Sequence, residues 1–297
     1  GFFDVFQELS GTSLKREESS ACGVHFLGAK QGSSKEVVDR LLHSLHLMAH
    51  RAGYADPKSC DGAGINLKID AEFWKNKFPN FKDVFEDNNY AIVASFIPEE
   101  AKAGEKYIAR FEKHLINEGL TLSAKREVPM NREHFGVVAT TQQLPIMQFL
   151  VLRPTDMPSA KFEAALLRFQ TRMDYETLKS TWDLEKKPSI ISAEPDGNVI
   201  YKGLMAPSDL ANAFPDLKDP LCKASRGLVH DRFCTNAPKG LDKIQPLSII
   251  ANNGEMNSLS SLYQFMTNDS SFLDFLGLEE SAKLWDETLE GEVPLSD

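Results

Sequence analysis

The chain has 297 residues and a formal net charge of −10, because 43 Asp and Glu outnumber 33 Lys and Arg. No block of basic residues stands out, so the composition argues against a protein that binds nucleic acid or an anionic membrane surface. The hydrophobic share of 42% and the charged share of 26% are ordinary for a globular protein of one or two domains, and apolar runs such as residues 149–152 are too short to span a bilayer.

Residues 1–21 form an arm that is apolar at its start and polar from Lys15 to Ser20. The arm has neither the basic start nor the long apolar core of a secretory signal. The next segment, residues 21–27, is rich in β-forming residues and predicts a strand. Ser33 and Ser34 then offer N-caps for a helix with Glu36 in its first turn. In that helix, residues at three- and four-residue spacing form one apolar face: Val38, Leu41, Leu42, Leu45, Met48 and Ala49.

The remaining elements follow from the same patterns. Residues 51–53 and 61–64 are rich in glycine and predict turns. Helical spacing predicts helices at residues 99–118 and 159–178. Strands are expected at residues 65–69, 90–97, 135–141, 147–152, 189–193, 199–204, 228–233 and 247–251. Asp196-Gly197 between two of these predicts a hairpin, and hairpins alongside separate helices indicate an α+β fold.

Four cysteines are present, and they form no C-x-x-C pair: Cys22, Cys60, Cys222 and Cys234. Four are too few for a secreted disulfide scaffold of this length, so we expect free thiols and a cytoplasmic location. Dinucleotide, P-loop and H-E-x-x-H motifs are absent from the sequence. Three histidines on one helical face, His43, His46 and His50, raise the possibility of a zinc site. Because no Cys or carboxylate completes a ligand set, we interpret them as a solvated polar face and expect no metal.

Cys22 stands out because small residues, Ala21 and Gly23, lie on either side of it. A cysteine that becomes the first residue of a chain carries a nucleophilic thiol and an α-amine whose pKa, about 7.7–8.0, suits a general base. From this segment alone, the commoner alternative is a buried strand cysteine.

Four separated segments decide between these alternatives. They are residues 22–24, residues 50–51 with 61–64, residues 230–236 and residues 252–257. In order and spacing they resemble the class II glutamine amidotransferase domain that opens the large subunit of glutamate synthase. Residues 201–203, 214–217 and 295–297 are also similar to that family. The resemblance extends from Cys22 to the end of the chain.

The resemblance implies an N-terminal-nucleophile (Ntn) hydrolase fold, a four-layer αββα sandwich with two antiparallel sheets, and hydrolysis of L-glutamine to glutamate and ammonia. Cys22 would be the nucleophile. The Asn253 side-chain amide and the Gly254 backbone N–H would form the oxyanion hole. The substrate-binding residues would be Arg51, Arg232 and Asp297, with Arg232 on the α-carboxylate and Asp297 on the α-ammonium. Without the family, Asn-Gly after a strand is more often simply a turn. The two arginines are then surface residues, and Asp297 is part of a frayed terminus.

This sequence departs from the family in the surroundings of those positions. It has His25 where glycine is usual, Ala52 inserted before Gly53, and Asn252 in place of histidine; Phe233 and Cys234 replace Tyr-Ser. A Cβ at Ala52 is expected to narrow the pocket or move the backbone.

The arm keeps Cys22 inside a peptide bond, so residues 1–21 are either a propeptide or a permanent extension. We therefore expect an arm at 1–21 and an amidotransferase domain at 22–297, truncated at its C-terminal end. The expected function is a glutaminase half-reaction that supplies ammonia to a synthase domain or subunit. The alternative is a degenerate or unprocessed domain with an assembly or regulatory role. No cofactor is expected in this segment; FMN and an iron–sulfur cluster are expected only in a full-length glutamate synthase.

Overall fold

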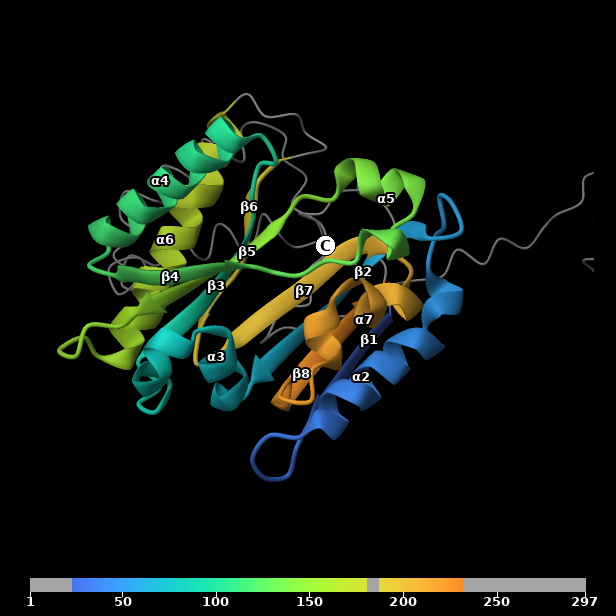
Figure 1. Cartoon of the computed structure of the whole chain (residues 1–297), viewed down its shortest axis with the longest axis horizontal. Helices are drawn as coiled ribbons and strands as arrows, with labels where there is room; N and C mark the ends of the chain where they lie inside the picture. Colours follow the sequence, from blue (N-terminus) through green and yellow to red (C-terminus); the bar gives the residue numbers. More distant parts are fainter. Residues whose placement is uncertain (1–22, 181–186, 232–297) are drawn as a thin grey trace, which may run out of the picture.

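The computed structural model describes residues 23–180 and 187–231, apart from the side chains of Arg51, Leu178 and Lys179. This part of the chain contains two four-stranded antiparallel sheets with helices packed against them (Figure 1). The first sheet has the order β1-β8-β2-β7, formed by β1 (Gly23–Gly28), β8 (Ala224–Asp231), β2 (Ser59–Ile69) and β7 (Asn198–Met205). The second has the order β4-β5-β3-β6, formed by β4 (Thr121–Glu127), β5 (Ile146–Leu152), β3 (Tyr90–Phe96) and β6 (Ser189–Pro195). The expected α+β class with two antiparallel sheets is confirmed.

Helix α2 (Lys35–Leu47) packs on β8 of the first sheet. Ser34 is its N-cap and accepts a hydrogen bond from the Glu36 backbone N–H at 3.1 Å, which satisfies one free donor of the first turn. Of the predicted apolar face, Val38, Leu41 and Leu45 are fully buried and the other three residues are half-buried. The Leu41 side chain lies 2.7 Å from the position that a Cβ on Gly227 would occupy. Glycine at this point of β8 therefore lets the helix approach the sheet closely.

Helices α4 (Ala101–Asn117) and α6 (Ser159–Lys179) cover one face of the second sheet. Phe111 of α4 stacks on Phe149 of β5 with ring centroids 4.1 Å apart and meets Phe169 of α6 edge-on at 4.7 Å. Both helices were predicted from their apolar spacing within two residues of the observed ends. This packing makes a separate hydrophobic core on the outer side of the second sheet.

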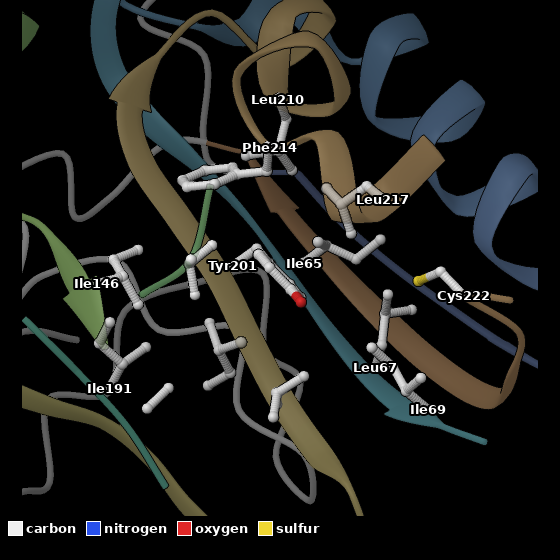
Figure 2. Close-up of a cluster of buried hydrophobic side chains, with 14 of the residues drawn as sticks. Ile65, Leu67, Ile69, Ile146, Ile191, Tyr201, Leu210, Phe214, Leu217 and Cys222 are labelled. Atoms are coloured by element: carbon white, nitrogen blue, oxygen red, sulfur yellow. The ribbon is translucent and has the colours of Figure 1, made fainter. Parts of the chain in front are cut away.

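The larger core joins the two sheets and α2, and Figure 2 shows part of it around Tyr201 of β7. Short helices close its edges. They are α3 (Ala71–Lys77), α5 (Val137–Gln142) and α7 (Leu210–Ala213), with 3₁₀ turns η1 (Ala49–Arg51), η2 (Pro79–Phe85), η3 (Arg132–His134), η5 (Pro207–Asp209) and η6 (Pro215–Lys218). Phe214, between α7 and η6, packs beside Tyr201 with ring centroids 5.7 Å apart, and Leu217 of η6 belongs to the same core (Figure 2).

The expected hairpin at residues 189–204 is half correct. Asp196 and Gly197 do form a tight turn with φ angles of 60° and 72°, as Asp-Gly turns require. The two strands that the turn joins nevertheless belong to different sheets, because β6 pairs with β3 and β7 pairs with β2. The turn therefore carries the chain from the second sheet to the first.

The strand expected at residues 135–141 is wrong, since residues 137–142 form helix α5. Two side chains from another loop satisfy its first backbone donors. Asp56 Oδ2 accepts from the Val138 N–H at 3.2 Å, and Ser59 Oγ accepts from the Ala139 N–H at 2.9 Å. This tertiary capping outweighs the β propensity of the valines.

The turn expected at residues 61–64 is also wrong, because β2 already begins at Ser59. The glycines there do mark an irregularity. Gly62 has a φ of 118°, and the pairing of β2 with β7 shifts register between Ser59 and Ala63, as a β-bulge does. The strand expected at residues 228–233 is described only as far as Asp231, and the one at 247–251 lies outside the described residues.

Candidate functional site

Most of the residues predicted for catalysis and substrate binding lie outside the described part of the chain. This is true of Cys22, Asn253 and Gly254 and of the substrate contacts Arg232 and Asp297. For Arg51 the structure describes the backbone, which ends η1, but not the side chain. The described residues next to these positions nevertheless define where they join the fold.

Strands β1 and β8 bring the described neighbours of two predicted positions together at one end of the first sheet. Gly23, which follows Cys22 in the chain, lies directly opposite Asp231, which precedes Arg232. Asp231 also pairs with Ala63 of β2 on its other side. Met48, the residue after α2, covers this end, and its Sδ lies 2.6 Å from the position of a Cβ on Gly23. A larger residue at position 23 would therefore displace Met48.

The turn after Met48 carries Arg51 to the same end of the sheet. Ala52 adopts an ordinary extended conformation with a φ of −68°, so its Cβ causes no backbone strain. Gly53 is the residue with no room for a side chain, because a Cβ there would lie 2.3 Å from Asp61 Oδ2. The Asp61 N–H donates to the Gly53 carbonyl at 2.9 Å. The inserted alanine is thus accommodated without backbone strain, and its effect on the pocket stays a prediction.

Tyr54 follows in this loop and is 49% exposed. It forms an isolated bridge with Cys60 at the start of β2. Burial is the main cause that raises the pKa of the Tyr54 phenol, and nearby acidic groups add to it: Cys60, Asp231 and Asp209. The Tyr54 phenol is therefore close enough to the fully buried Asp231, at the end of β8, for the carboxyl group to affect its pKa.

His230 precedes Asp231, and the alternation of a β-strand directs the two side chains to opposite faces of the first sheet. His230 lies opposite Val24 of β1 and Gly64 of β2. Burial lowers the pKa of His230 to about 4, so the imidazole is neutral at physiological pH. Within the described part of the chain, neither ring nitrogen has a hydrogen-bond partner.

The loop that contains Tyr54 is held against α5. Asp56 accepts from the backbone N–H groups of Lys58 and Ser59, at 2.9 and 2.8 Å, in addition to that of Val138. Hydrogen bonds, first of all from the Ser59 hydroxyl, hold the pKa of Asp56 well below its usual range. These hydrogen bonds anchor the loop between Arg51 and β2 to helix α5.

The zinc alternative gains no support. His43, His46 and His50 are all exposed on α2 and η1, as a solvated polar face requires. Among residues 23–180 and 187–231, no group of three His, Cys, Asp or Glu side chains could hold a metal ion. His25 is also exposed, on the edge strand β1, so it does not obstruct the end of the sheet.

Two of the cysteines expected to be packing residues are confirmed as buried free thiols, Cys60 and Cys222. The Cys60 Sγ donates to the Met205 carbonyl at 2.7 Å. Burial raises the pKa of the Cys222 thiol to about 12, which makes it a poor nucleophile. Cys234 lies outside the described residues.

Sequence reasoning missed the groups that surround the start of β1. His230 and Asp231 belong to the motif at residues 230–236, but the sequence gave neither of them a role, and Tyr54 belongs to no motif. Buried carboxylates of Asp61 and Asp231 are the strongest structural signal here. Proximity of Asp231 to Arg232 in the sequence was the one hint available beforehand.

Comparison with known proteins adds family information to this geometry. Residues 22–285 match the family model of class II glutamine amidotransferases. The chain is 30% identical over 272 residues to the NADH glutamate synthase of Saccharomyces cerevisiae, covering 87% of this chain and 13% of that protein. It is 27% identical over 253 residues to the large chain of the NADPH glutamate synthase of Azospirillum brasilense, covering 84% and 16%.

A third relative, the ferredoxin-dependent glutamate synthase 2 of Synechocystis, is 28% identical over 264 residues, covering 88% of this chain and 16% of that protein. The chain thus spans less than a fifth of the length of these relatives. None of the described helices is long and apolar enough to cross a membrane.

Proposed function

The chain belongs to the class II glutamine amidotransferases, and from that premise we propose that it hydrolyses glutamine to glutamate and ammonia with Cys22 as the nucleophile. The proposal includes removal of residues 1–21, which frees the α-amine of Cys22 to act as the base. It also takes residues 22–297 as the amidotransferase domain.

One observation carries the proposal: the register of β1 and β8. Gly23 lies opposite Asp231, so the chain neighbours of Cys22 and Arg232 meet at one end of the first sheet. Met48 directly precedes the turn η1 and packs onto Gly23, so the Arg51 backbone in η1 lies near the same end of the sheet. Segments that are far apart in the sequence are thus joined where the nucleophile would begin the chain.

The proposed chemistry needs one residue for two roles. The α-amine of Cys22 takes the thiol proton while Sγ forms a bond to the side-chain amide carbon of glutamine. The amide N of Asn253 and the backbone N–H of Gly254 stabilise the oxyanion. The C–N bond then breaks, and the ammonium of Cys22 returns its proton to the departing ammonia. Water cleaves the γ-glutamyl thioester, which releases glutamate and restores the thiol.

Substrate recognition is assigned to three charged residues. Arg232 is proposed to bind the α-carboxylate of glutamine, since a guanidinium donates two parallel hydrogen bonds to a carboxylate. Asp297 is proposed to bind the α-ammonium, and Arg51 to close the pocket. Two departures from the family, His25 and Ala52, do not oppose this function, because the first is exposed and the second is unstrained.

The ammonia acceptor is proposed to lie in a larger protein. The three relatives are glutamate synthases, and the matched region is 13–16% of their length. We therefore propose that this segment supplies ammonia for glutamate synthesis by a synthase domain or subunit. The hydrolytic step itself requires a thiol, an amine and water, and no cofactor is assigned to this segment.

The test compares the full chain with a chain that begins at Cys22. We expect glutaminase activity in the shorter chain, its loss in Cys22→Ala, and an intact mass of the active full-length preparation that lacks residues 1–21. Cys222→Ala is the matched control, since that thiol is buried in the core. If the chain beginning at Cys22 neither hydrolyses nor binds glutamine, the proposal is wrong and an assembly or regulatory role is favoured. An active protein that retains the arm would refute the α-amine as the base.

A further inference from the structure

Helix α5 and the loop before β2 together present an exposed apolar surface. Val137 and Val138, at the start of α5, are 77% and 39% exposed, and Tyr54 in the loop is 49% exposed. Asp56, two residues after Tyr54, accepts from the Val138 N–H at 3.2 Å and so holds the loop beside the helix (Figure 1). Thr141 is exposed on the same helix. We call Tyr54, Val137, Val138 and Thr141 the α5 patch.

Helix α5 is also uncharged, which is unusual for a helix at the surface of this chain. Residues 135–152 contain no Asp, Glu, Lys or Arg, although 26% of the whole chain is charged. The outer face of α2, by contrast, carries an ion pair between Arg40 and Glu36 at 2.6 Å, and α4 exposes Glu105 and Lys106. Such charged side chains are normal on the solvent side of a helix. An exposed surface without charge, next to a tyrosine, has the composition of the centre of a protein–protein interface.

Hydrogen bonds within the domain hold the α5 patch in place. The loop side chains Asp56 and Ser59 cap the first turn of α5. The Thr141 hydroxyl donates to the Val138 carbonyl at 2.7 Å, so this polar group is used inside the helix. The loop and the helix are therefore already ordered before any partner binds. A preorganised surface loses little conformational entropy when it is covered, which favours docking.

Charge and length distinguish between two occupants of the α5 patch. A second copy of this chain is disfavoured, because each copy has a net charge of −10 and like charges oppose association. The matched region is only 13–16% of three glutamate synthases, so in those proteins it belongs to a chain several times longer. Domains of one chain commonly bury about 600–1,500 Å² against each other. A domain in such a protein needs a surface for that contact, and the α5 patch has the composition for it.

We propose that the α5 patch is the docking surface for the larger part of a glutamate-synthase-type protein, which covers it with an apolar, uncharged surface of its own. The inference rests on the proposed function for the identity of this partner. Val137 is the most exposed side chain of the patch and gains most from being removed from water. Tyr54 adds a large apolar ring with a hydroxyl that can remain at the wet edge of the contact.

The first test identifies what lies on the α5 patch in the natural protein, produced in its own host. A benzophenone amino acid, which cross-links on irradiation, replaces Val137; in the matched control it replaces Ile116, which is 70% exposed on α4. We expect position 137 to cross-link to a peptide of glutamate synthase sequence beyond the amidotransferase region, and position 116 to give no such product. If position 137 yields only a second copy of the chain, residues 1–297 of the same molecule, another protein or no product, the inference is wrong.

The second test adds a charge to the patch. With the cross-linker at Thr141, Val137→Asp should reduce the cross-link by about tenfold or more, because a carboxylate is costly to bury in an apolar contact. An acidic residue in the first turn of a helix is favourable, so the variant should keep the urea midpoint of the parent chain. Leu167→Asp, at an exposed position of α6, is the matched control and should leave the cross-link unchanged.

An undiminished cross-link in Val137→Asp would overturn the docking surface. Neither readout requires glutaminase activity, so the two proposals can fail separately. An inactive protein that still cross-links from position 137 would refute the proposed chemistry alone, and an active protein without this cross-link would refute the docking surface alone.

Discussion

Asp216 is the centre of a buried polar network that joins the two sheets. Arg126 of β4 donates to its carboxylate, with Nη1 3.4 Å from Oδ1, and the Tyr201 hydroxyl of β7 donates to Oδ2 at 3.0 Å. The side chains of Asp216 and Arg126 are 2% and 14% exposed. We predict that Asp216→Asn strongly destabilises the protein, because the guanidinium then stays buried without its counter-charge.

The magnitude follows from the burial of both partners. Removing one partner of a buried ion pair costs about 3–5 kcal/mol. Arg126 keeps its hydrogen bond to Gln148, at 2.8 Å, so we expect the lower end of that range, about 3 kcal/mol. For a domain of this size the corresponding fall in Tm is about 6–12 °C. Urea unfolding followed by tryptophan fluorescence measures the change, and Trp74 lies 5.9 Å from the Arg126 guanidinium carbon.

Asp219→Asn is the matched control for this prediction. Asp219 binds Lys77 at 2.9 Å in the same region, but its side chain is 22% exposed, so the expected cost is at most about 1 kcal/mol. Combining Arg126→Met with Asp216→Asn should cost less than the sum of the two single changes, since both remove the same pair. Equal urea midpoints for Asp216→Asn and Asp219→Asn would refute the reasoning.

Asp174 and His230 are expected to change stability in opposite directions between pH 4 and 7. Burial raises the pKa of Asp174 to about 7, so the unfolded chain loses this proton at lower pH than the folded chain. The free energy of unfolding therefore falls as pH rises from about 4 to 7, by up to about 4 kcal/mol at pH 7. Urea unfolding of Asp174→Asn should not show this fall. Burial lowers the pKa of His230 to about 4, so the unfolded chain takes up this proton first as pH falls. The free energy of unfolding should therefore fall between about pH 6.5 and 4, by about 2 kcal/mol at pH 5, and His230→Gln should not show this fall. A pH-independent offset between variant and parent would contradict either expectation. Ser59→Ala removes the acceptor of the Ala139 N–H, so it should lower the free energy of unfolding by about 1–3 kcal/mol and speed hydrogen exchange at Ala139. Unchanged exchange at Ala139 would show that helix α5 does not need this cap.

Helices that bury one face were predictable from the sequence, because their apolar spacing records which side meets the core. The face of α2 and its cap Ser34 are examples, and so are the two helices of the outer core. Where a distant segment determines the conformation, local patterns mislead. Helix α5 begins in a β-branched run, and its capping groups, Asp56 and Ser59, come from a loop about 80 residues earlier.

The same limit applies to the candidate site. The motif segments were recognisable only together, from their order and spacing, and the nucleophilic role of Cys22 followed from the family they indicate. What no spacing indicated is that Asp231 lies opposite the first described residue of β1 and that Tyr54 lies close to Asp231, because strand pairing and the anchored loop bring them there. The segment 214–217, which also resembled the family, is explained by the ion pair of Asp216 in the core, away from β1.

Register between β1 and β8 is therefore the feature on which the proposed chemistry depends. Sliding β1 by one residue would place Val24 opposite Asp231 and exchange the faces of every side chain in the strand. A valine side chain at that point would collide with Met48, whose Sδ is already 2.6 Å from the position of a Cβ on Gly23. Glycine at position 23 thus selects one register, and that register places the buried Asp231 directly opposite the residue that follows Cys22 in the chain.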